Sequence, residues 1–361
     1  MKRTVGVLLI ALILAASGCS KAKPTNSPPP APEPQSQAQP QPEPPKADPP
    51  KPVEPVSGPI YLLEQPAKPL WAGPASVVIE NSPQAHPQAG YLEADLVVEG
   101  LAESEVTRTL AFYWSRPAAQ IGPVRSARTW LVALADAYHS PFAHSGGNMD
   151  ALAELRNNWG ASNLDEIYTA GGYFYRSNDR EPPHNLYIAT DLLGRAVSER
   201  GINMKPVPTT PRAPAGSPAP SGGRVTRVDV AWHPLHTVTW QLDGGQYKRS
   251  EHYKATVSET PAAEPHMAES GEVVASPNLV MLEVQGENNG WELGWTLFYA
   301  QGGKATVISA GTAWEGTWKL GDGGFALTPA DGAKVPPLAA GPVWVQLISP
   351  ESAFSLTRTD G

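Results

Sequence analysis

Cysteine, basic charge and long apolar runs are all scarce in this sequence. A single cysteine in 361 residues excludes an intramolecular disulfide, so we expect the hydrophobic core alone to stabilise the folded part. The formal net charge is −8, which argues against a nucleic-acid partner because such partners need a clustered basic surface. Beyond the first 16 residues, no apolar run is long enough to span a bilayer.

The N-terminus has the pattern of a lipoprotein signal peptide. Lys2 and Arg3 form a charged start, residues 5–16 are mostly apolar, and small residues at 16–18 precede Cys19. We predict a signal peptide over 1–18, followed by a lipidated Cys19 that leaves no thiol for a nucleophile or a metal site. Two acyl chains on Cys19 would attach the chain to the cell membrane on its extracytoplasmic side. An ordinary secreted protein and an uncleaved anchor are the alternatives.

Proline-rich segments divide the rest of the chain. Residues 20–57 contain 14 prolines and almost no large apolar side chains, so they cannot bury enough surface to fold. We therefore predict a disordered Pro-rich tether over 19–58. A second segment rich in proline, glycine and serine, 205–223, predicts a linker or a long exposed loop. Two folded domains are expected on either side of it, over 59–204 and 224–361.

The first of these domains mixes two periodicities. Apolar and β-branched runs predict strands over 75–80, 95–102 and 106–114, and apolar residues at helical spacing predict helices over 129–138, 149–155 and 191–199. Strands interleaved with helices are typical of an α/β domain, or of an α+β domain. We expect such a domain, with two or three layers.

The second domain has strand patterns only. Candidate strands cover 225–232, 237–242, 278–284, 295–300, 305–309, 317–320 and 343–348, and turn pairs that contain glycine separate several of them. Short strands joined by such turns are typical of antiparallel sandwiches and barrels. We expect a mostly antiparallel, all-β C-terminal domain.

Two arginines stand where a loop passes into the first predicted helix. In the segment 121–128 (IGPVRSAR), Arg125 and Arg128 lie about one turn apart, next to backbone N–H groups that the helix leaves unpaired. A helix N-terminus and two guanidinium groups can together bind a carboxylate or a phosphate. The alternative is that local acids, such as Glu103, Glu105 or Asp136, pair with these arginines.

A second loop, 141–150, has a similar construction. His144 ends a short apolar run, two glycines follow, and Asp150 stands at the start of the next predicted helix. Ligands of open α/β sheets bind at the carboxyl ends of strands, so His144 is a candidate acid or base. A structural role for His144 and a helix-cap role for Asp150 are the alternatives. With His184 these residues could bind a metal, but their spacing matches no standard motif, and we predict no metal and no cofactor.

A third cluster lies in the segment 171–187 (GGYFYRSNDREPPHNLY). It combines Arg176, Arg180, His184 and Asn185 with four aromatic residues. Arginines bind anionic groups and aromatic ring faces stack on sugars or peptides, so this segment is a candidate binding loop. Simple anchoring of a long loop is the alternative.

A series of short strings runs through both predicted domains. The strings are VVIEN (77–81), HPQAG (86–90), GPVRSAR (122–128), HSGG (144–147), PHNLY (183–187), YKR (247–249) and PNLV (277–280). In this order they resemble the YerB-like bacterial lipoproteins over nearly all of the folded chain. The resemblance implies two domains and an envelope location, and it implies no reaction. The chain departs from that family at Glu80, where an aspartate is expected, and around His266.

The leading functional hypothesis is an envelope lipoprotein whose first domain binds an anionic wall peptide or polymer. Its site would combine side chains from one strand and three loops: Arg108, Arg125, Arg128, Arg176, Arg180, Asn185, His144 and His184. The first alternative is an envelope hydrolase, with His144 or His184 as acid or base and Asp150 as a further catalytic residue. The second alternative is a protein-interaction scaffold, which is favoured if the arginine loops lie far apart.

Overall fold

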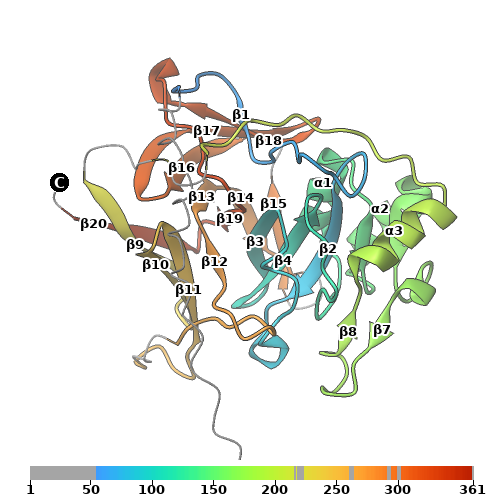
Figure 1. Ribbon diagram of the computed structural model, residues 1–361. Coiled ribbons are helices and arrows are strands. Elements are labelled where there is room, and N and C mark those ends of the chain that lie inside the picture. The colour runs from blue at the N-terminus through green and yellow to red at the C-terminus, as the bar shows by residue number, and fades with distance from the viewer. Residues whose placement is uncertain are drawn as a thin grey trace, which may run out of the picture. The chain divides into compact units, whose positions relative to one another are not determined.

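Strands from both predicted domains form one mixed sheet (Figure 1). The computed structural model describes residues 54–214, 217, 223–259, 264–290, 294–298 and 302–359. The predicted signal peptide, Cys19 and most of the predicted tether lie outside these residues. Within them, the sheet has eleven strands. In spatial order they are β1 (Ile60–Tyr61), β18 (Gly324–Pro329), β17 (Thr312–Gly321), β16 (Gly303–Ser309), β13 (Asn278–Glu283), β19 (Val343–Ile348), β3 (Leu96–Glu103), β4 (Val106–Tyr113), β2 (Ala75–Glu80), β5 (Phe142–His144) and β6 (Asn163–Asp165).

The two halves of this sheet meet where β19 lies parallel to β3. Val345 pairs with Val98, and Gln346 pairs with Glu99. On its other side β19 is also parallel to β13, and every residue of β19 is buried. Strands buried on both faces read as continuous apolar runs, which is why the sequence identifies β2, β3 and β19 clearly. The predicted α/β N-terminal part and mostly antiparallel C-terminal part are confirmed, and the two parts share one sheet.

A second, antiparallel sheet contributes to the same core. Its strands are β12 (Ala275–Ser276), β11 (Gln246–Tyr253), β10 (His236–Asp243), β9 (Arg224–His233) and β20 (Ala353–Thr359), in that spatial order. Gly244 and Gly245 both have positive φ between β10 and β11, as a two-residue hairpin turn requires. The rings of Trp240 in β10 and Trp344 in β19 lie 5.1 Å apart, so the inner faces of the two sheets are in contact.

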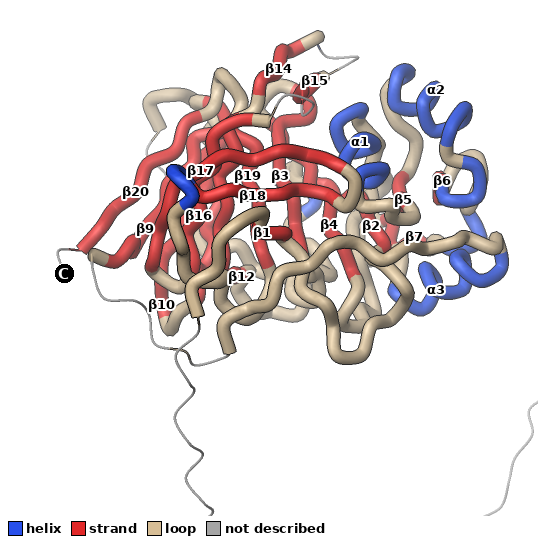
Figure 2. Tube along the Cα trace, turned by 90° about the horizontal axis from the view of Figure 1, so that it is seen from above, coloured by secondary structure: helices blue, strands red, loops and turns tan. Residues whose placement is uncertain are grey.

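Helices and short hairpins complete the described structure. The helices are α1 (Thr129–Ala137), α2 (Met149–Asn158) and α3 (Thr190–Glu199), with single 3₁₀ turns at η1 (Pro83–Ala85), η2 (Gly160–Ser162), η3 (Gly171–Tyr173) and η4 (Ala330–Gly332). The hairpins are β7 (Tyr175–Arg176) with β8 (Leu186–Tyr187), and β14 (Gln285–Asn288) with β15 (Trp295–Phe298). Figure 2 shows α1 and α2 on one side of β2 and β5, and α3 on the other.

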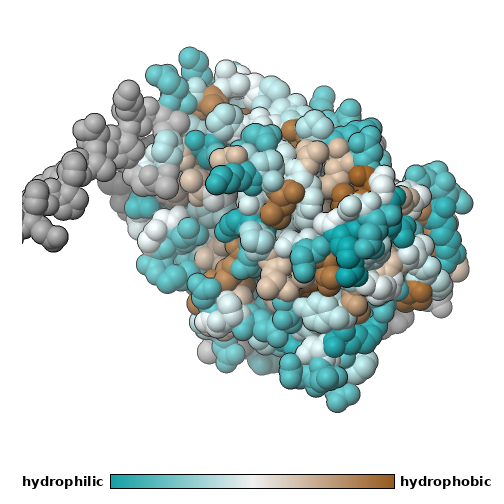
Figure 3. Space-filling view, turned by 45° about the vertical axis from the view of Figure 1, so that its right-hand side comes forward, coloured by the Kyte–Doolittle hydropathy of each residue, from teal (hydrophilic) through white to brown (hydrophobic). Residues whose placement is uncertain are grey.

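The outer surface of the helical end is mostly hydrophilic. Figure 3 shows its apolar residues scattered among hydrophilic ones. The helices bury one side only; in α3, for example, Leu193 and Ala196 are buried while Asp191 is exposed. None of the helices in the described part of the chain has the length and apolarity to span a bilayer.

Among the described strands of six or more residues, three have no counterpart in the sequence prediction: β11, β18 and β20. Strand β11 (QYKRSEHY) lacks an apolar pattern because two of its inward-facing residues, Arg249 and Glu251, are charged. The described part of the predicted linker also differs from an exposed loop. Residues 205–214 pack on the molecule, with Val207 and Arg212 buried and the backbone N–H of Thr210 donating to a carbonyl at 3.1 Å.

A buried ionic network occupies the space between the two sheets. At its centre the Arg249 side chain is fully buried and its guanidinium lies between two carboxylates. Its Nη2 donates to Oε1 of Glu99 at 2.9 Å, and its Nη1 donates to Oε2 of Glu251. The rings of Trp344 and Trp240 lie 5.3 and 5.8 Å from the guanidinium carbon. The charges therefore compensate one another out of contact with water.

Side chains of the main sheet satisfy the remaining acceptors of Glu99. Oε1 accepts from Thr107 Oγ1 at 2.9 Å and from Asn81 Nδ2 at 3.2 Å, and Oε2 accepts from the indole N–H of Trp344 at 3.0 Å. Both oxygens are thus bonded, as a buried carboxylate requires. Since Arg249 belongs to β11 and Glu99 to β3, the network joins the two sheets.

Removal of the Arg249 charge should destabilise the fold strongly. Arg249→Ala leaves Glu99 and Glu251 buried without their cation, so we expect the free energy of unfolding to fall by ~3–5 kcal/mol in urea titrations. The matched control is Arg227→Ala, since Arg227 pairs with Asp229 at 2.6 Å on the exposed surface of the second sheet. That change should cost under ~1 kcal/mol. Equal losses in the two variants would contradict a stabilising role for the buried network.

Candidate functional site

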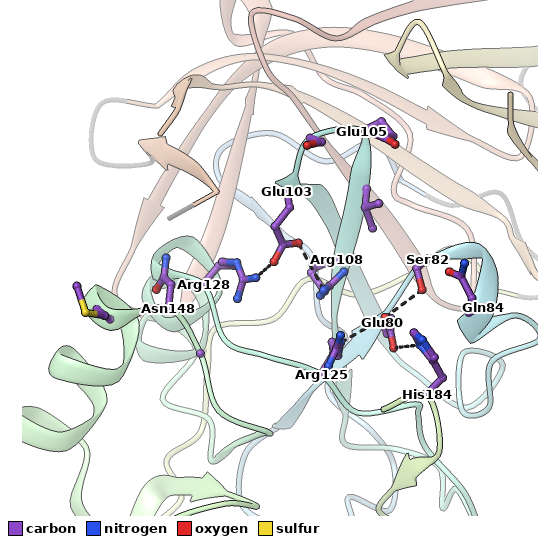
Figure 4. Close-up of a pocket in the computed structure, with 14 residues that line it drawn as sticks. Glu80, Ser82, Gln84, Glu103, Glu105, Arg108, Arg125, Arg128, Asn148 and His184 are labelled. Carbon is purple, nitrogen blue, oxygen red and sulfur yellow. Dashed lines mark hydrogen bonds and ion pairs between the residues drawn. The ribbon is translucent and has the colours of Figure 1, made fainter. Parts of the chain in front are cut away.

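A pocket of about 670 Å³ opens at the ends of β2, β3 and β4. Charged side chains of both signs line it (Figure 4): Glu80, Glu103, Glu105, Arg108, Arg125, Arg128 and His184. The residues 147–149, at the start of α2, form a further part of its wall. The pocket therefore combines arginines with the N-terminus of α2, and it contains as many carboxylates as guanidinium groups.

The segment 121–128 brings the pocket residues together through its backbone. The N–H of Glu80 donates to the carbonyl of Pro123 at 2.9 Å, and the N–H of Arg125 donates to the carbonyl of Val78 at 3.1 Å. The segment thus extends the β2 edge of the sheet. These bonds place Glu80 and Arg125 next to each other although they lie far apart in the sequence.

The same segment is bonded to the two other predicted loops. The N–H of Ala127 donates to the carbonyl of Gly146 at 2.9 Å, and the N–H of Val124 donates to the carbonyl of Leu186 at 2.7 Å. Gly122 makes this packing possible. A Cβ on Gly122 would lie 2.7 Å from the Leu186 carbonyl oxygen, and its φ of +149° is rare for other residues. The arginine loops therefore lie side by side, which counts against the interaction-scaffold hypothesis.

Glu80 is the most enclosed acid of the pocket, with 2% of its surface exposed. Its Oε2 accepts from Nδ1 of His184 at 2.9 Å, its Oε1 accepts from the Ser82 hydroxyl at 3.0 Å, and Nε of Arg125 lies 3.3 Å from the same oxygen. The carboxylate therefore holds both His184 and Arg125 in place.

Glu103 compensates the other two arginines. Nη2 of Arg108 lies 3.4 Å from one carboxylate oxygen, and Nη2 of Arg128 pairs with the other. Burial lowers the pKa of Arg108, Arg125 and Arg128, and that of Arg128 falls to about 10, which still leaves its guanidinium charged at neutral pH. The local pairing proposed as an alternative for the two loop arginines is therefore present, with Glu103 for Arg128 and Glu80 for Arg125.

Among the charged and ionisable side chains of the pocket, three groups have no bonded partner in the described part of the chain. They are the two terminal nitrogens of Arg125, Nε2 of His184 and the carboxylate of Glu105. Figure 4 shows Arg125 and His184 together at one end of the pocket and Glu105 at the other. A ligand could bond to these groups without breaking the existing ion pairs.

The other residues of the predicted site lie outside this pocket. His144 is fully buried, with Nδ1 at 2.8 Å from the Gly146 carbonyl and Nε2 at 2.9 Å from Oδ1 of Asn163. Asp150 lies in the first turn of α2 and is exposed. The structure thus brings together Arg108, Arg125, Arg128 and His184, and it gives His144 a position inside the fold.

The cluster 176–185 is likewise bonded within itself and to a neighbouring loop. Arg176 donates to Asn185 Oδ1 at 3.0 Å and pairs with Glu166 at 3.1 Å. Arg180 donates to the backbone carbonyls of Ala85, at 2.7 Å, and of Pro87. Ligand contacts for Arg176, Arg180 and Asn185 therefore stay a prediction that the pocket geometry does not support.

The acids of the pocket are the functional residues that sequence reasoning undervalued. From the sequence, Glu103 and Glu105 are expected only as counter-ions of the loop arginines, and Glu80 only as a departure from the family pattern. A usable signal existed, because Glu80 and Arg108 are direct partners across β2 and β4. Side chains on paired positions of adjacent strands lie on the same face, so opposite charges there indicate a polar face.

One group of side chains outside the pocket has the composition of a metal site. Ligand atoms of His86, Glu251 and His266 all lie within 4.8 Å of one another. Each is already engaged: Nδ1 of His266 and Oε2 of Glu251 accept from Arg249, and Nε2 of His86 lies 3.1 Å from Asn81 Oδ1. The guanidinium provides the cation that this group requires, so the residues fit a metal ion poorly.

Hydrogen bonds in the network fix the protonation of His266. Nε2 of Gln88 donates to Asn81 Oδ1 at 2.7 Å and to the Glu80 carbonyl at 3.1 Å, so its Oε1 must accept from Nε2 of His266. Nδ1 of His266 then accepts from Arg249, and the ring is neutral. Burial, followed by the Arg249 charge, accordingly holds the pKa of His266 well below its usual value, and burial also lowers the pKa of His86.

Acidification should therefore destabilise the fold. Unfolded His266 and His86 bind protons below about pH 6.5 while the folded state resists protonation, so stability is lost as pH falls. We expect the free energy of unfolding to decrease between pH 7 and 5.5. Each of the two histidines contributes up to about 1.4 kcal/mol to this decrease per pH unit. In His266→Gln the free energy of unfolding should decrease less steeply with falling pH. The difference between variant and wild type at pH 8 gives the stability cost of the lost contacts alone. A parallel decrease in both proteins would contradict this assignment.

Comparisons with known proteins agree with the fold. Residues 63–203 match the N-terminal domain, and residues 227–345 the C-terminal domain, of "Protein of unknown function (DUF3048)". The "Putative lipoprotein YerB" of Bacillus subtilis (strain 168) is 28% identical over 288 residues, which are 80% of this chain and 85% of that protein. The crystal structure of YerB protein from Bacillus subtilis matches with a TM-score of 0.64 and 26% identity, over 79% of this chain and 94% of the other. The chain therefore belongs to the two-domain DUF3048 family, which confirms the resemblance to the YerB-like proteins.

Proposed function

We propose that this protein is a membrane-anchored extracytoplasmic lipoprotein that binds an anionic envelope ligand in the pocket beside Arg125. The lipoprotein designation of the Bacillus subtilis relative supports the anchor predicted at Cys19, a residue outside the described part of the chain. The ligand group would be a carboxylate of a wall peptide or a phosphate of a wall polymer. The observation that carries the proposal is the free end of the Arg125 guanidinium in a pocket of about 670 Å³.

The position of Arg125 suits a binding role. Its Nε faces Glu80, which orients the guanidinium, and its two terminal nitrogens remain for a ligand. Two parallel N–H donors match the geometry of a carboxylate or a phosphate. The N-terminus of α2, with Asn148 as its cap, lies in the same wall and adds a favourable field for an anion.

Loss of the Arg125 side chain should weaken ligand binding without unfolding the protein. We expect Arg125→Ala, in the full chain purified in detergent, to bind wall peptide or polymer fragments at least about tenfold more weakly by calorimetry, since a charge-assisted contact is lost. Arg195→Ala is the control, because Arg195 is half exposed on α3 and pairs with Glu199 outside the pocket. Unchanged affinity in Arg125→Ala would rule out the proposed site.

A second candidate function, hydrolysis of an envelope polymer, is favoured by the His184–Glu80 pair. The bond from Nδ1 to the buried carboxylate fixes the imidazole and leaves Nε2 free at the pocket. An imidazole oriented in this way can take a proton from an attacking water, and the arginines can stabilise negative charge that develops on the substrate. His184 is the acid or base here, because both ring nitrogens of His144 are bonded inside the fold.

If the protein is a hydrolase, turnover depends on His184. Wall fragments incubated with the full chain should then release smaller products, and His184→Ala should reduce the rate by about 100-fold or more, in line with the loss of a general base. Arg195→Ala should retain the rate. Intact fragments after prolonged incubation with the wild-type protein would instead leave binding as the function of the pocket.

A further inference from the structure

We propose that the pocket ligand is a zwitterion, namely a peptide that carries a carboxylate and a free ammonium group several bonds apart. The inference rests on the proposed function and narrows its ligand to one chemical class. The carboxylate would bond to Arg125, and the ammonium group would pair with Glu105 at the opposite end of the pocket.

The charge balance of the pocket is the first argument. Three carboxylates face three guanidinium groups, so the lining has no net excess of positive charge apart from His184. Glu80 and Glu103 are each held in ion pairs with arginines of the lining. A polymer of phosphates would bring repeated negative charge against these acids, whereas a zwitterion adds no net charge. The pocket therefore matches a ligand with both signs better than a polyanion.

The second argument is the position of the two groups that stay unbonded. Within the described residues, the terminal nitrogens of Arg125 and the carboxylate of Glu105 have no hydrogen-bond or ion-pair partner. Figure 4 shows them at opposite ends of the pocket, with Arg108 between them. The unbonded end of the Arg125 guanidinium and the unpaired Glu105 carboxylate lie apart in one pocket, so they are complementary to a ligand that has a carboxylate at one end and an ammonium group at the other.

The third argument is that the backbone fixes the place of Glu105. Glu105 is the second residue of the tight two-residue turn between β3 and β4, and Ser104, the first, has a φ of +46°. The Glu105 carbonyl accepts from Nδ1 of the fully buried His236 at 2.8 Å, and Nε2 of His236 donates to Glu251 at 2.6 Å. The buried network thus holds the Glu105 backbone, and Glu105, which is partly exposed, lines the pocket. A binding group that is positioned beforehand needs little ordering when the ligand arrives.

The volume of the pocket indicates a peptide rather than a single amino acid. About 670 Å³ lies within the range of sites that enclose drug-sized ligands. Met149, at the pocket rim, has 77% of its surface exposed and offers an apolar contact next to the charged groups. A peptide with a C-terminal carboxylate and a side-chain amine would supply both charges, and its aliphatic side-chain carbons could contact Met149.

The test compares three forms of one tetrapeptide that contains lysine: the free form, the form acetylated on the lysine amine, and the form amidated at its C-terminus. Calorimetry with the full chain in detergent should show the free form binding at least about tenfold more tightly than either modified form. Glu105→Gln should lose the preference for the free amine and keep the preference for the free carboxylate. This variant retains the carbonyl that accepts from His236, so its urea midpoint should be unchanged.

Two controls separate this inference from the proposed function. Glu351→Gln, in an exposed turn before β20, should bind like the wild type. Arg125→Ala should lose affinity for the free and the acetylated peptide alike. If Arg125→Ala weakens binding while acetylation and Glu105→Gln change nothing, the anion site stands and the zwitterion inference is overturned. Tighter binding of linear polyphosphate than of the free peptide, increased further in Glu105→Gln, would also overturn it.

Discussion

The ion pair of Arg249 with Glu99 and Glu251 is the interaction on which the rest of this structure depends. All three side chains lie in the interior, where an unpaired charge costs several kcal/mol, so none can be present without the others. Burial raises the pKa of Glu99, whereas the Arg249 charge and the His236 hydrogen bond outweigh burial at Glu251 and hold its pKa well below its usual value. Because the partners belong to different sheets, the charges set how the sheets are placed against each other.

The pocket depends on the same strands through the alternation of their side chains. Asn81 and Thr107 bond inside the network, while their chain neighbours Glu80 and Arg108 line the pocket. Successive side chains of a strand point to opposite faces, so a backbone fixed by the network also fixes the pocket residues. The Glu105 carbonyl, held by His236, is a further link of this kind. The buried network therefore positions the pocket side chains that these strands carry, Glu80 and Arg108.

The sequence predicts those parts of the fold whose periodicity is apolar, and it predicts poorly those parts whose interior is polar. Helices and buried strands appear within a few residues of their predicted bounds, whereas β11 was missed because Arg249 and Glu251 take the places of apolar residues. The arginines at the start of α1 stand out in the sequence because a helix start has a local signal, and in the structure they line the pocket. His144 has the same local signal, yet a carbonyl and an amide oxygen bond both of its ring nitrogens. Such a partner comes from tertiary structure, which a linear pattern does not contain.

The sequence strings that resemble the YerB-like proteins contribute residues both to the pocket and to the buried network. In the string 77–81, Glu80 serves the pocket and Asn81 the network, and Arg249 of the string 247–249 is the centre of the network. Similarity in these strings therefore reflects the interior of the fold as much as the pocket. At Glu80, where the resemblance leads us to expect an aspartate, the carboxylate bonds to His184 and faces Arg125. Because Glu80 and Asn81 are neighbours in the chain, we expect a substitution at either residue to affect both the pocket and the network. The ends of the Arg125 and Glu105 side chains lie outside the network, so substitutions there test the pocket separately from stability.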